Sequence, residues 1–351
     1  MKKVGIITIN DNLNCGNRLQ NYALQEVIKS MGLDAVTLKN DALLNSKNEI
    51  IINSLKYIKK ILISNKKIKK NIKENFSRFN TLIKFSKNMI TCFSKNIKKD
   101  YDYFIVGSDQ VWKPTRNRLS DIDLLTFANN SQKISYAASF GISNIDEIYQ
   151  EKLKRELPNF KAISVRENEG KTIIEKSAGI KNIEVLLDPT MLLDKSEWRK
   201  VSTNTKINHK KYAVCYFLGD VNISDITEFC EQNKLGVMFF NKKNEDFGPS
   251  EFLSSIDNAE IVFTDSFHGS VFSILFEKEF YVLERKEKDL RNDMISRINT
   301  LLNTFNLENR KINKIINLKR FKCDYASVNY ILENERKKSK EFLEKALDLN
   351  K

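Results

Sequence analysis

The sequence predicts an α/β protein of two domains, and three of its features support that prediction. Its 351 residues are more than a single hydrophobic core usually serves. Short apolar runs alternate with helical patterns along the chain, which is typical of parallel α/β folds. Apolar residues make up 41% and charged residues 30% of the chain, as in ordinary folded soluble proteins.

The first domain is expected over residues 1–200. Its strands are predicted at short apolar runs, residues 4–9, 35–38, 103–107, 134–138, 162–166 and 184–188. Helical patterns are predicted between them, at residues 18–31 and 167–178. Pro189 cannot donate a backbone hydrogen bond, so the last of these strands is expected to end there.

A polar stretch, residues 202–211, indicates a linker to a second domain over residues 201–325. The second domain repeats the alternation of strands and helices. Its strands are predicted at residues 212–218, 237–240, 261–264 and 280–283, and its helices at residues 224–233, 250–255 and 270–276. The last segment, residues 326–351, is helical and charged, and we expect it to pack on the surface.

A basic helical insertion is predicted over residues 46–100 of the first domain. This segment has 15 Lys and Arg against 3 Asp and Glu, so it supplies +12 of the net charge of +14. Apolar residues recur in it at steps mostly of three to four, as in amphipathic helices. Such helices can cover a sheet with a solvated face, or contact anionic lipid or an anionic substrate. No nucleic-acid recognition motif accompanies the lysines, so a nucleic-acid partner is not expected.

Location and metal content follow from the cysteines and from the longest apolar runs. The five cysteines are dispersed and lack C-x-x-C spacing, which argues against disulfides and zinc and favours the reducing cytoplasm. The apolar run after Met1 is too short for a signal peptide, and no run reaches the 18 residues of a membrane span. We expect a cytoplasmic protein without a bound metal.

His268 is the leading catalytic candidate. The chain has only two histidines, and histidine is the side chain best suited to move protons near neutral pH. His209 lies in the basic linker, whereas His268 follows a buried strand and precedes Gly269 and a helix. Ligands of open α/β sheets bind at the carboxyl ends of strands. The alternative is a histidine with a purely structural role.

Two further strand ends carry polar groups. Asn17 and Arg18 lie in the first strand-to-helix turn, which suits an anion or a sugar but is not a G-x-G-x-x-G dinucleotide fingerprint. Ser108 and Asp109 follow the strand at residues 103–107, with Trp112 nearby. A carboxylate beside an aromatic ring is typical of sugar sites, although Trp112 can equally be part of the core.

Arg166 ends another predicted strand and is suited to hold a carboxylate or phosphate. The alternative is a simple ion pair with Glu167. The chain contains no P-loop, no G-x-S-x-G elbow, no H-E-x-x-H and no D-x-D-type cluster. ATP-dependent transfer, serine hydrolysis and metal-dependent hydrolysis therefore lack support.

Six segments together resemble the polysaccharide pyruvyl transferase family. They occur in the order of the family from about residue 4 to residue 310: residues 16–25 (GNRLQNYALQ), 107–112 (GSDQVW), 135–141 (SYAASFG), 164–167 (SVRE), 188–190 (DPT) and 264–269 (TDSFHG). The resemblance implies a fold similar to B-type glycosyltransferases, with two Rossmann-like domains facing each other across a cleft.

The resemblance also implies an activity. Family members transfer the enolpyruvyl unit of phosphoenolpyruvate to saccharides of capsules, exopolysaccharides or cell-wall polymers, which gives a pyruvate ketal and releases phosphate. His268 is then the expected acid and Asp109 the expected base or sugar ligand. Phosphoenolpyruvate is the donor substrate, and no cofactor is expected. Substrate contacts are expected from Asn17, Arg18, Ser108, Arg166, Ser266, Gly269 and Arg285.

One residue departs from the family pattern. Many members have Arg two residues before the histidine, where this chain has Ser266, so an expected phosphate anchor is missing. Arg285, Lys286 and Arg291 are candidates to replace it. Two alternative functions stay open: a B-type glycosyltransferase that uses a nucleotide sugar, and a noncatalytic protein of a polymer assembly complex that binds saccharide or membrane. The acceptor can be lipid-linked, with contact at the inner face of the membrane.

Overall fold

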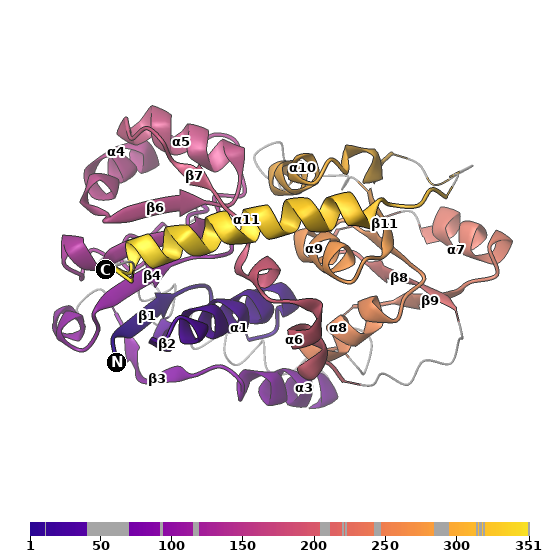
Figure 1. Ribbon diagram of the computed structural model, residues 1–351, viewed down its shortest axis with the longest axis horizontal. Helices are drawn as coiled ribbons and strands as arrows, with labels where there is room; N and C mark the ends of the chain where they lie inside the picture. Colours follow the sequence, from indigo (N-terminus) through magenta and orange to yellow (C-terminus); the bar gives the residue numbers. More distant parts are fainter. Residues whose placement is uncertain are drawn as a thin grey trace, which may run out of the picture. The chain divides into compact units, whose positions relative to one another are not determined.

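The computed structural model folds into α-helices and parallel β-sheets (Figure 1). The structure describes residues 1–10, 12–40, 70–91, 94–114, 119–203, 211–219, 221, 223–241, 247–283, 295–313, 315, 318 and 320–349. Every strand pairing within these ranges is parallel. The α/β class predicted from the sequence is therefore confirmed.

The chain divides into two compact units. Unit 1 comprises Met1–Ile68, Asn80–Leu192 and Glu335–Lys351, and unit 2 comprises Lys69–Phe79 and Leu193–Asn334. These bounds differ from the predicted domains in three respects. Residues 193–200 belong to unit 2, residues 69–79 of the basic insertion also belong to unit 2, and the last helix is shared between the units. The bounds of the units depend on contacts between segments that are far apart in the sequence. Hydrophobic periodicity within a short segment does not indicate such contacts.

Unit 1 contains a seven-stranded sheet in the order β3-β2-β1-β4-β5-β6-β7. Its strands are β1 (Lys3–Ile7), β2 (Asp34–Asn40), β3 (Phe85–Ile90), β4 (Tyr103–Val106), β5 (Lys133–Ala138), β6 (Ala162–Val165) and β7 (Glu184–Val185). From β1 the chain builds the sheet outward on one side through β2 and β3, then continues on the other side from β4. The strand order thus reverses between β1 and β4, where ligands of doubly wound folds bind.

The helices of unit 1 cover this sheet. They are α1 (Cys15–Ser30), α4 (Glu147–Glu156) and α5 (Asn168–Ala178), with short 3-10 turns η2 (Lys95–Lys99), η3 (Asn130–Gln132), η4 (Leu157–Asn159) and η5 (Pro189–Leu192). Pro189 begins η5, whereas β7 already ends at Val185, so the predicted strand end at Pro189 was wrong by three residues. One core cluster joins the strands to Leu153 of α4, Ile174 of α5 and the ring of Trp112. Trp112 is therefore a core residue.

Unit 2 contains a five-stranded sheet in the order β12-β11-β10-β8-β9. Its strands are β8 (Tyr212–Tyr216), β9 (Gly236–Phe239), β10 (Ile261–Thr264), β11 (Glu279–Leu283) and β12 (Lys311–Ile312). The helical elements around it are α3 (Lys70–Asn80), α6 (Lys195–Lys200), α7 (Ile223–Gln232), α8 (Pro249–Asp257), α9 (Phe267–Leu275), α10 (Ile295–Thr304) and η6 (Glu308–Arg310). Here the strand order reverses between β8 and β10, which gives unit 2 a switch point of its own.

The described part of the basic insertion includes α3, which is amphipathic. Its apolar residues Ile72, Phe76 and Phe79 are buried, and the ring of Phe76 lies 5.7 Å from that of Phe247. Arg78 pairs with the buried carboxylate of Glu251 at the start of α8. The helical prediction is thus confirmed for α3 and wrong for residues 85–90, which form the edge strand β3. Residues 46–69 lie outside the described part of the chain.

The C-terminal helix α11 (Tyr325–Ala346) contributes to both units. Val328 and Leu332 are buried in its first half, and Leu343 in its second half. Arg336 Nε donates to the carbonyl of Met191 at 2.6 Å, and the Ser339 hydroxyl accepts from the backbone of Leu187 at 3.3 Å. The predicted surface helix is therefore also part of the interior.

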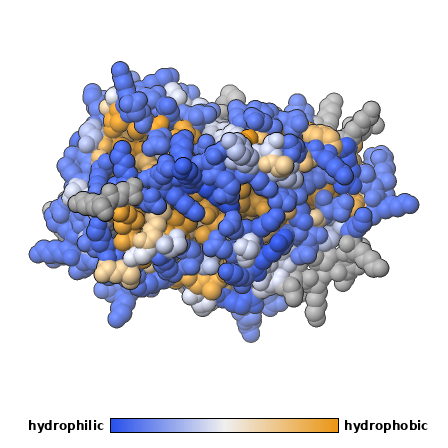
Figure 2. Space-filling view, in the orientation of Figure 1, coloured by the Kyte–Doolittle hydropathy of each residue, from blue (hydrophilic) through white to orange (hydrophobic). Residues whose placement is uncertain are grey.

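The visible face of the molecule is predominantly hydrophilic, with apolar patches between the polar residues (Figure 2). None of the described helices combines the length and the apolar character that crossing a membrane demands.

Candidate functional site

The switch point of unit 1 gathers side chains from the loops that follow β1 and β4. The Thr8 hydroxyl donates to the carbonyl of Ser108 at 3.3 Å, which ties the two loops together. The Gln20 amide, from the first turns of α1, donates to the Thr8 hydroxyl at 2.8 Å and accepts from the backbone of Ser108 at 3.2 Å. All three residues are fully buried. They fix the loop that carries Asp109.

Asp109 is the partly exposed carboxylate of this switch point. Its side chain is 14% exposed, and Oδ1 lies 3.7 Å from the guanidinium of Arg166. The amide of Asn17 donates to Oδ2 at 3.1 Å. The backbone of Asp109 is left-handed, with φ of 68°, and its carbonyl accepts from Val111 and Ser139. A non-glycine residue held in this conformation is more common at functional sites than elsewhere.

Arg166 lies beneath Asp109 in a buried network. Its guanidinium pairs with Asp188, whose side chain is fully buried, and donates to the Ser108 hydroxyl at 3.3 Å. Burial alone lowers the pKa of Arg166, but Asp188, Asp109 and Glu167 outweigh burial and raise it overall. The other oxygen of Asp188 accepts from the backbone and hydroxyl of Thr190. Arg166 is thus a permanent cation beside Asp109.

Arg18 is also buried. Its guanidinium donates to the carbonyl of Ile9 at 2.9 Å and to Oδ1 of Asn17 at 2.6 Å. Because the Asn17 oxygen accepts from Arg18, the Asn17 nitrogen is the atom that faces Asp109. The sequence predicted Arg18 and Arg166 as anion contacts. In the structure both are oriented toward protein acceptors and organise Asn17 and Asp109.

Glu167 shapes the neighbouring loop after β5. One of its carboxylate oxygens accepts from the hydroxyl of Ser139 and from the backbone of Phe140 and Gly141, at 2.7 to 3.0 Å. Gly141 has a φ of 64°, and a Cβ atom there would lie 2.0 Å from the side chain of Gln110. The sequence left a simple ion pair of Arg166 with Glu167 open as an alternative. The structure instead pairs Arg166 with Asp188 and Asp109, and this oxygen of Glu167 binds the loop after β5.

The switch point of unit 2 is organised by Asp265, which follows β10. Its two carboxylate oxygens accept from the backbone of Leu218 at 2.7 Å and of Gly219 at 2.8 Å, in the loop after β8. Thr264 reinforces this link, since its hydroxyl donates to the carbonyl of Tyr216 at 2.7 Å. The loops after β8 and β10 are therefore fixed to each other where α9 begins.

Ser266 and Gly269 form the first turn of α9. Ser266 is the N-cap residue, and its hydroxyl accepts from the backbone of Gly269 at 3.4 Å. A Cβ atom at Gly269 would lie 2.3 Å from the hydroxyl of Thr264, so the helix approaches β10 closely because this residue is glycine. Both predicted substrate contacts thus have a structural explanation in the local fold.

His268 lies in the same turn and is 8% exposed. Its ring packs edge-on against that of Phe267, with 5.3 Å between centroids. The guanidinium of Arg297, from α10, lies 5.9 Å from the centroid of the Phe267 ring. The first turn of α9 therefore combines a histidine, a helix N-terminus whose dipole favours anions and a nearby buried arginine.

Comparison with known proteins decides the family. The family model for polysaccharide pyruvyl transferase matches residues 14–287, which is most of the chain. The chain belongs to the polysaccharide pyruvyl transferase family. Family membership implies a transferase enzyme, as the sequence predicted. No curated protein sequence matches the chain.

A comparison with solved structures finds matches at low identity. S. aureus MnaA in complex with UDP has 11% identity and a TM-score of 0.44, over 90% of this chain and 100% of that one. A putative UDP-N-acetylglucosamine 2-epimerase from Listeria monocytogenes has the same identity and TM-score, over 97% of each chain. E. coli ADP-heptose lipopolysaccharide heptosyltransferase II has 8% identity and a TM-score of 0.35, over 95% and 99%.

For this pyruvyl transferase family member, the structure brings the predicted site residues together in two groups. In unit 1 the group consists of Asn17, Arg18, Ser108, Asp109 and Arg166. In unit 2 it consists of Ser266, His268 and Gly269. Arg285, Lys286 and Arg291 lie outside the described residues.

Sequence reasoning missed four residues of these groups. Asp188 and Asp265 lie within segments that resemble the family, so their place in these motifs could have indicated them as site residues. Gln20 likewise lies in the first segment. Arg297 had no such signal, because its approach to Phe267 depends on how α10 packs. Among the described residues, no three His, Cys, Asp or Glu side chains gather as metal ligands would.

Proposed function

We propose that the protein transfers the pyruvyl group of phosphoenolpyruvate to two hydroxyls of a saccharide, in the biosynthesis of a cell-surface polysaccharide. The family supports the pyruvyl transfer and the saccharide acceptor. The observation that carries the proposal is His268, placed in the first turn of α9 at the switch point of unit 2. In this position an imidazole suited to proton transfer lies at a helix N-terminus, which attracts anions.

The reaction needs an acid. In the first step the methylene carbon of phosphoenolpyruvate gains a proton, and a saccharide oxygen bonds to the neighbouring carbon as its hydroxyl proton leaves. In the second step another hydroxyl bonds to the same carbon, the bond from that carbon to the phosphate oxygen breaks, and the hydroxyl proton leaves with the phosphate. A methyl-bearing ketal remains. Protonated His268 supplies the proton of the first step.

The reaction also needs an acceptor for the hydroxyl proton, and Asp109 takes this role. Both of its oxygens face donors of the protein, Asn17 and Arg166, so its orientation is fixed before substrate arrives. Such preorganisation reduces the free-energy cost of reaching the transition state. Asp109 keeps partial exposure, which a group that contacts the acceptor requires.

The donor carries a carboxylate and a phosphate, and the start of α9 suits such charges. Backbone N–H groups of the first turn and the helix dipole favour anions there. Ser266 stands where many family members have arginine, and it caps the helix instead. Arg297 is the described cation beside this turn, and we assign it the role of the missing phosphate anchor.

The acceptor and the location complete the proposal. We infer that the saccharide is presented on a lipid carrier at the cytoplasmic face of the membrane, and that the basic segment 46–100 contacts anionic lipid there. The charge of this segment, +12 of the total of +14, supports that contact. No cofactor other than the donor enters the proposed reaction.

The function is tested by phosphate release from phosphoenolpyruvate in the presence of candidate saccharides. His268→Gln is expected to lower kcat at least about 100-fold, the usual contribution of a general acid. Arg297→Met is expected to raise the KM for phosphoenolpyruvate more than it lowers kcat. His209→Gln is the matched control for the loss of an imidazole, and it should retain the activity of the parent protein.

Two outcomes contradict this proposal. Turnover of a nucleotide sugar, without phosphate release from phosphoenolpyruvate for any acceptor, would identify a glycosyltransferase instead. If the parent protein binds saccharide but turns over neither phosphoenolpyruvate nor a nucleotide sugar, and His268→Gln leaves that binding intact, the noncatalytic binding protein becomes the better explanation. Mass spectrometry of the product separates these cases, since a pyruvate ketal adds one pyruvate less water to the saccharide.

A further inference from the structure

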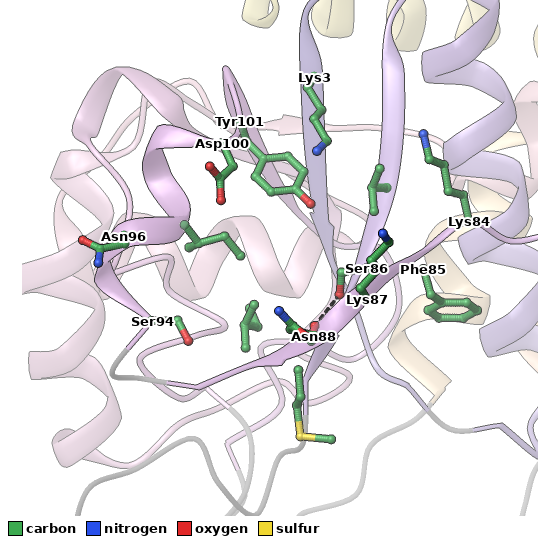
Figure 3. A pocket seen from close by; sticks show the side chains of 14 residues that line it. Lys3, Lys84, Phe85, Ser86, Lys87, Asn88, Ser94, Asn96, Asp100 and Tyr101 are labelled. Carbon is green, nitrogen blue, oxygen red and sulfur yellow. Dashed lines mark hydrogen bonds between the residues drawn. The ribbon is translucent and has the colours of Figure 1, made fainter.

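Unit 1 has a large open groove along its edge strand β3, away from the residues of the candidate site. Its volume is about 770 Å³, which lies within the range of ligand-binding pockets. Figure 3 shows Asp100 and Tyr101 across the groove from Ser86 and Asn88 of β3. The strand segment from Lys84 to Ile90 lines one wall, and six residues of strand extend about 20 Å. The groove therefore has room for an extended ligand.

The charge of the groove is positive. Its lining contains the lysines Lys3, Lys84 and Lys87 and a single acid, Asp100. Lys84 pairs with Asp34 at 2.6 Å, whereas the ammonium of Lys3 lies 4.4 Å from the centroid of the buried Tyr101 ring. Lys87 is exposed on β3. The charge distribution favours an anionic occupant.

The remaining lining combines polar groups and aromatic rings with the apolar side chains of Val36, Met89, Ile90 and Ile97. Amides come from Asn88 and Asn96, and a hydroxyl comes from Ser94. Phe85 and Tyr101 contribute aromatic side chains. Amides and hydroxyls beside aromatic rings suit a saccharide, which presents hydroxyls at its edges and C–H groups on its faces.

A chain of contacts links the far end of the groove to Asp109. Ile90, which lines the groove at the end of β3, pairs with Asn40 of β2. The Asn40 amide donates to the carbonyl of Thr8 at 3.1 Å, and the Thr8 hydroxyl donates to the carbonyl of Ser108. Ser108 adjoins Asp109. Three strand spacings separate β3 from β4, or about 14 Å, so an extended chain can reach from the groove to the candidate site.

We propose that this groove binds an anionic stretch of the saccharide chain whose sugar is modified at Asp109. This inference rests on the proposed function, since it assigns the groove to the same acceptor. The pyruvate ketal itself carries a carboxylate, so a chain that has already been modified fits the charge of the groove. The groove would then favour successive modification of one polymer over modification of separate short saccharides.

Direct binding tests the groove without reference to catalysis. Isothermal titration with a uronic-acid oligosaccharide and a neutral glucan of equal length is expected to show binding of the anionic chain alone. Lys87→Glu should weaken that binding about tenfold, because it replaces an attraction by a repulsion. Lys87→Arg keeps the charge and should retain the affinity. Lys176→Glu, at an exposed position of α5, is the matched control and should also retain it.

The following outcomes would contradict the proposal that the groove binds an anionic saccharide. Equal losses for Lys87→Glu and Lys176→Glu would mean that only the overall charge matters. Equal binding of the neutral glucan would remove the role of the lysines. If Lys87→Glu abolishes binding to vesicles of anionic lipid and leaves the uronic-acid oligosaccharide bound, the groove is a lipid contact. Failure of pyruvyl transfer with intact groove binding would instead contradict the proposed reaction alone.

Discussion

At the scale of single residues, the candidate site of unit 1 consists of side chains that hold one another. Arg166 is paired with the buried Asp188 and lies 3.7 Å from the partly exposed Asp109. A buried charge has a desolvation penalty. If its partner is removed, the penalty remains and the attraction that offset it is lost. Removing either member should therefore cost far more stability than removing an exposed ion pair.

A double-mutant cycle on this pair measures that difference. Arg166→Met and Asp188→Leu should each lower the free energy of unfolding by about 3–5 kcal/mol, and the double variant should lose less than the sum. The control cycle uses Arg199 and Asp257, an exposed pair at 2.7 Å, where about 1 kcal/mol or less is expected. Urea denaturation provides the values. Equal costs for the two pairs would contradict a buried, coupled network.

The sequence predicted where the residues of the candidate site lie better than it predicted their contacts. Asn17, Asp109 and His268 follow predicted strands, and strand ends meet at the switch points, so their location could be inferred. The partners of Arg18 and Arg166 could not. Whether an arginine faces a ligand or a protein acceptor depends on distant residues such as Asp188, which periodicity does not reveal.

At the scale of elements, short apolar runs predicted the buried strands, whereas an edge strand with polar residues was not predicted. β10 was predicted at its observed bounds, because its four residues are apolar or β-branched and fully buried. β3 was not predicted, since it is an edge strand whose Lys87, Asn88 and Met89 are exposed. α4, α6 and α10 were missed as well. These helices have many charged or polar residues, so the apolar residues that recur every three to four positions, and from which a helix is predicted, are few.

The end of the chain is tied to the start of β4, and this contact makes stability depend on pH. Tyr103 donates to Asp348 at 2.8 Å. Burial, and then the hydrogen bond to Asp348, raises the pKa of Tyr103 from 10.0 to about 12. The neutral form is thus favoured in the folded state. Its stabilising contribution is complete below pH 10 and is lost as the pH rises toward 12.

Tyr103→Phe tests this dependence. The variant cannot ionise at residue 103, so its free energy of unfolding should fall less steeply between pH 10 and pH 12 than that of the parent protein. Tyr330→Phe, at a residue that is 73% exposed on α11, is the control and should follow the parent curve. Urea denaturation at a series of pH values gives the slopes. Identical slopes for all three proteins would remove Tyr103 from the explanation.

At the scale of the whole molecule, charge is the property with the widest consequence. The formal net charge is +14, and residues 46–100 supply most of it. The described part of this segment includes α3 and the wall of the groove, which belong to different units. One basic segment thus contributes to both compact units. Attraction to anionic surfaces follows from the charge of this segment and does not depend on the catalytic groups.

Vesicle binding tests the membrane contact proposed for this segment. The protein is expected to sediment with vesicles that contain anionic lipid and to be released at about 1 M salt, where the Debye length falls to roughly 3 Å. Vesicles of neutral lipid serve as the control. Binding that persists in high salt, or equal binding to neutral vesicles, would show that the charge of the basic segment is not the cause.

The division of α11 between the two units sets an order of events during synthesis. Unit 1 includes residues 335–351, and its buried Ser339 and Leu343 come from this last stretch. A ribosome produces the chain from its N-terminus, so all of β1 to β7 and then all of unit 2 emerge before these residues do. The unit whose synthesis begins first is therefore completed last. Its sheet stays without the buried side chains of the second half of α11 until translation has passed that helix.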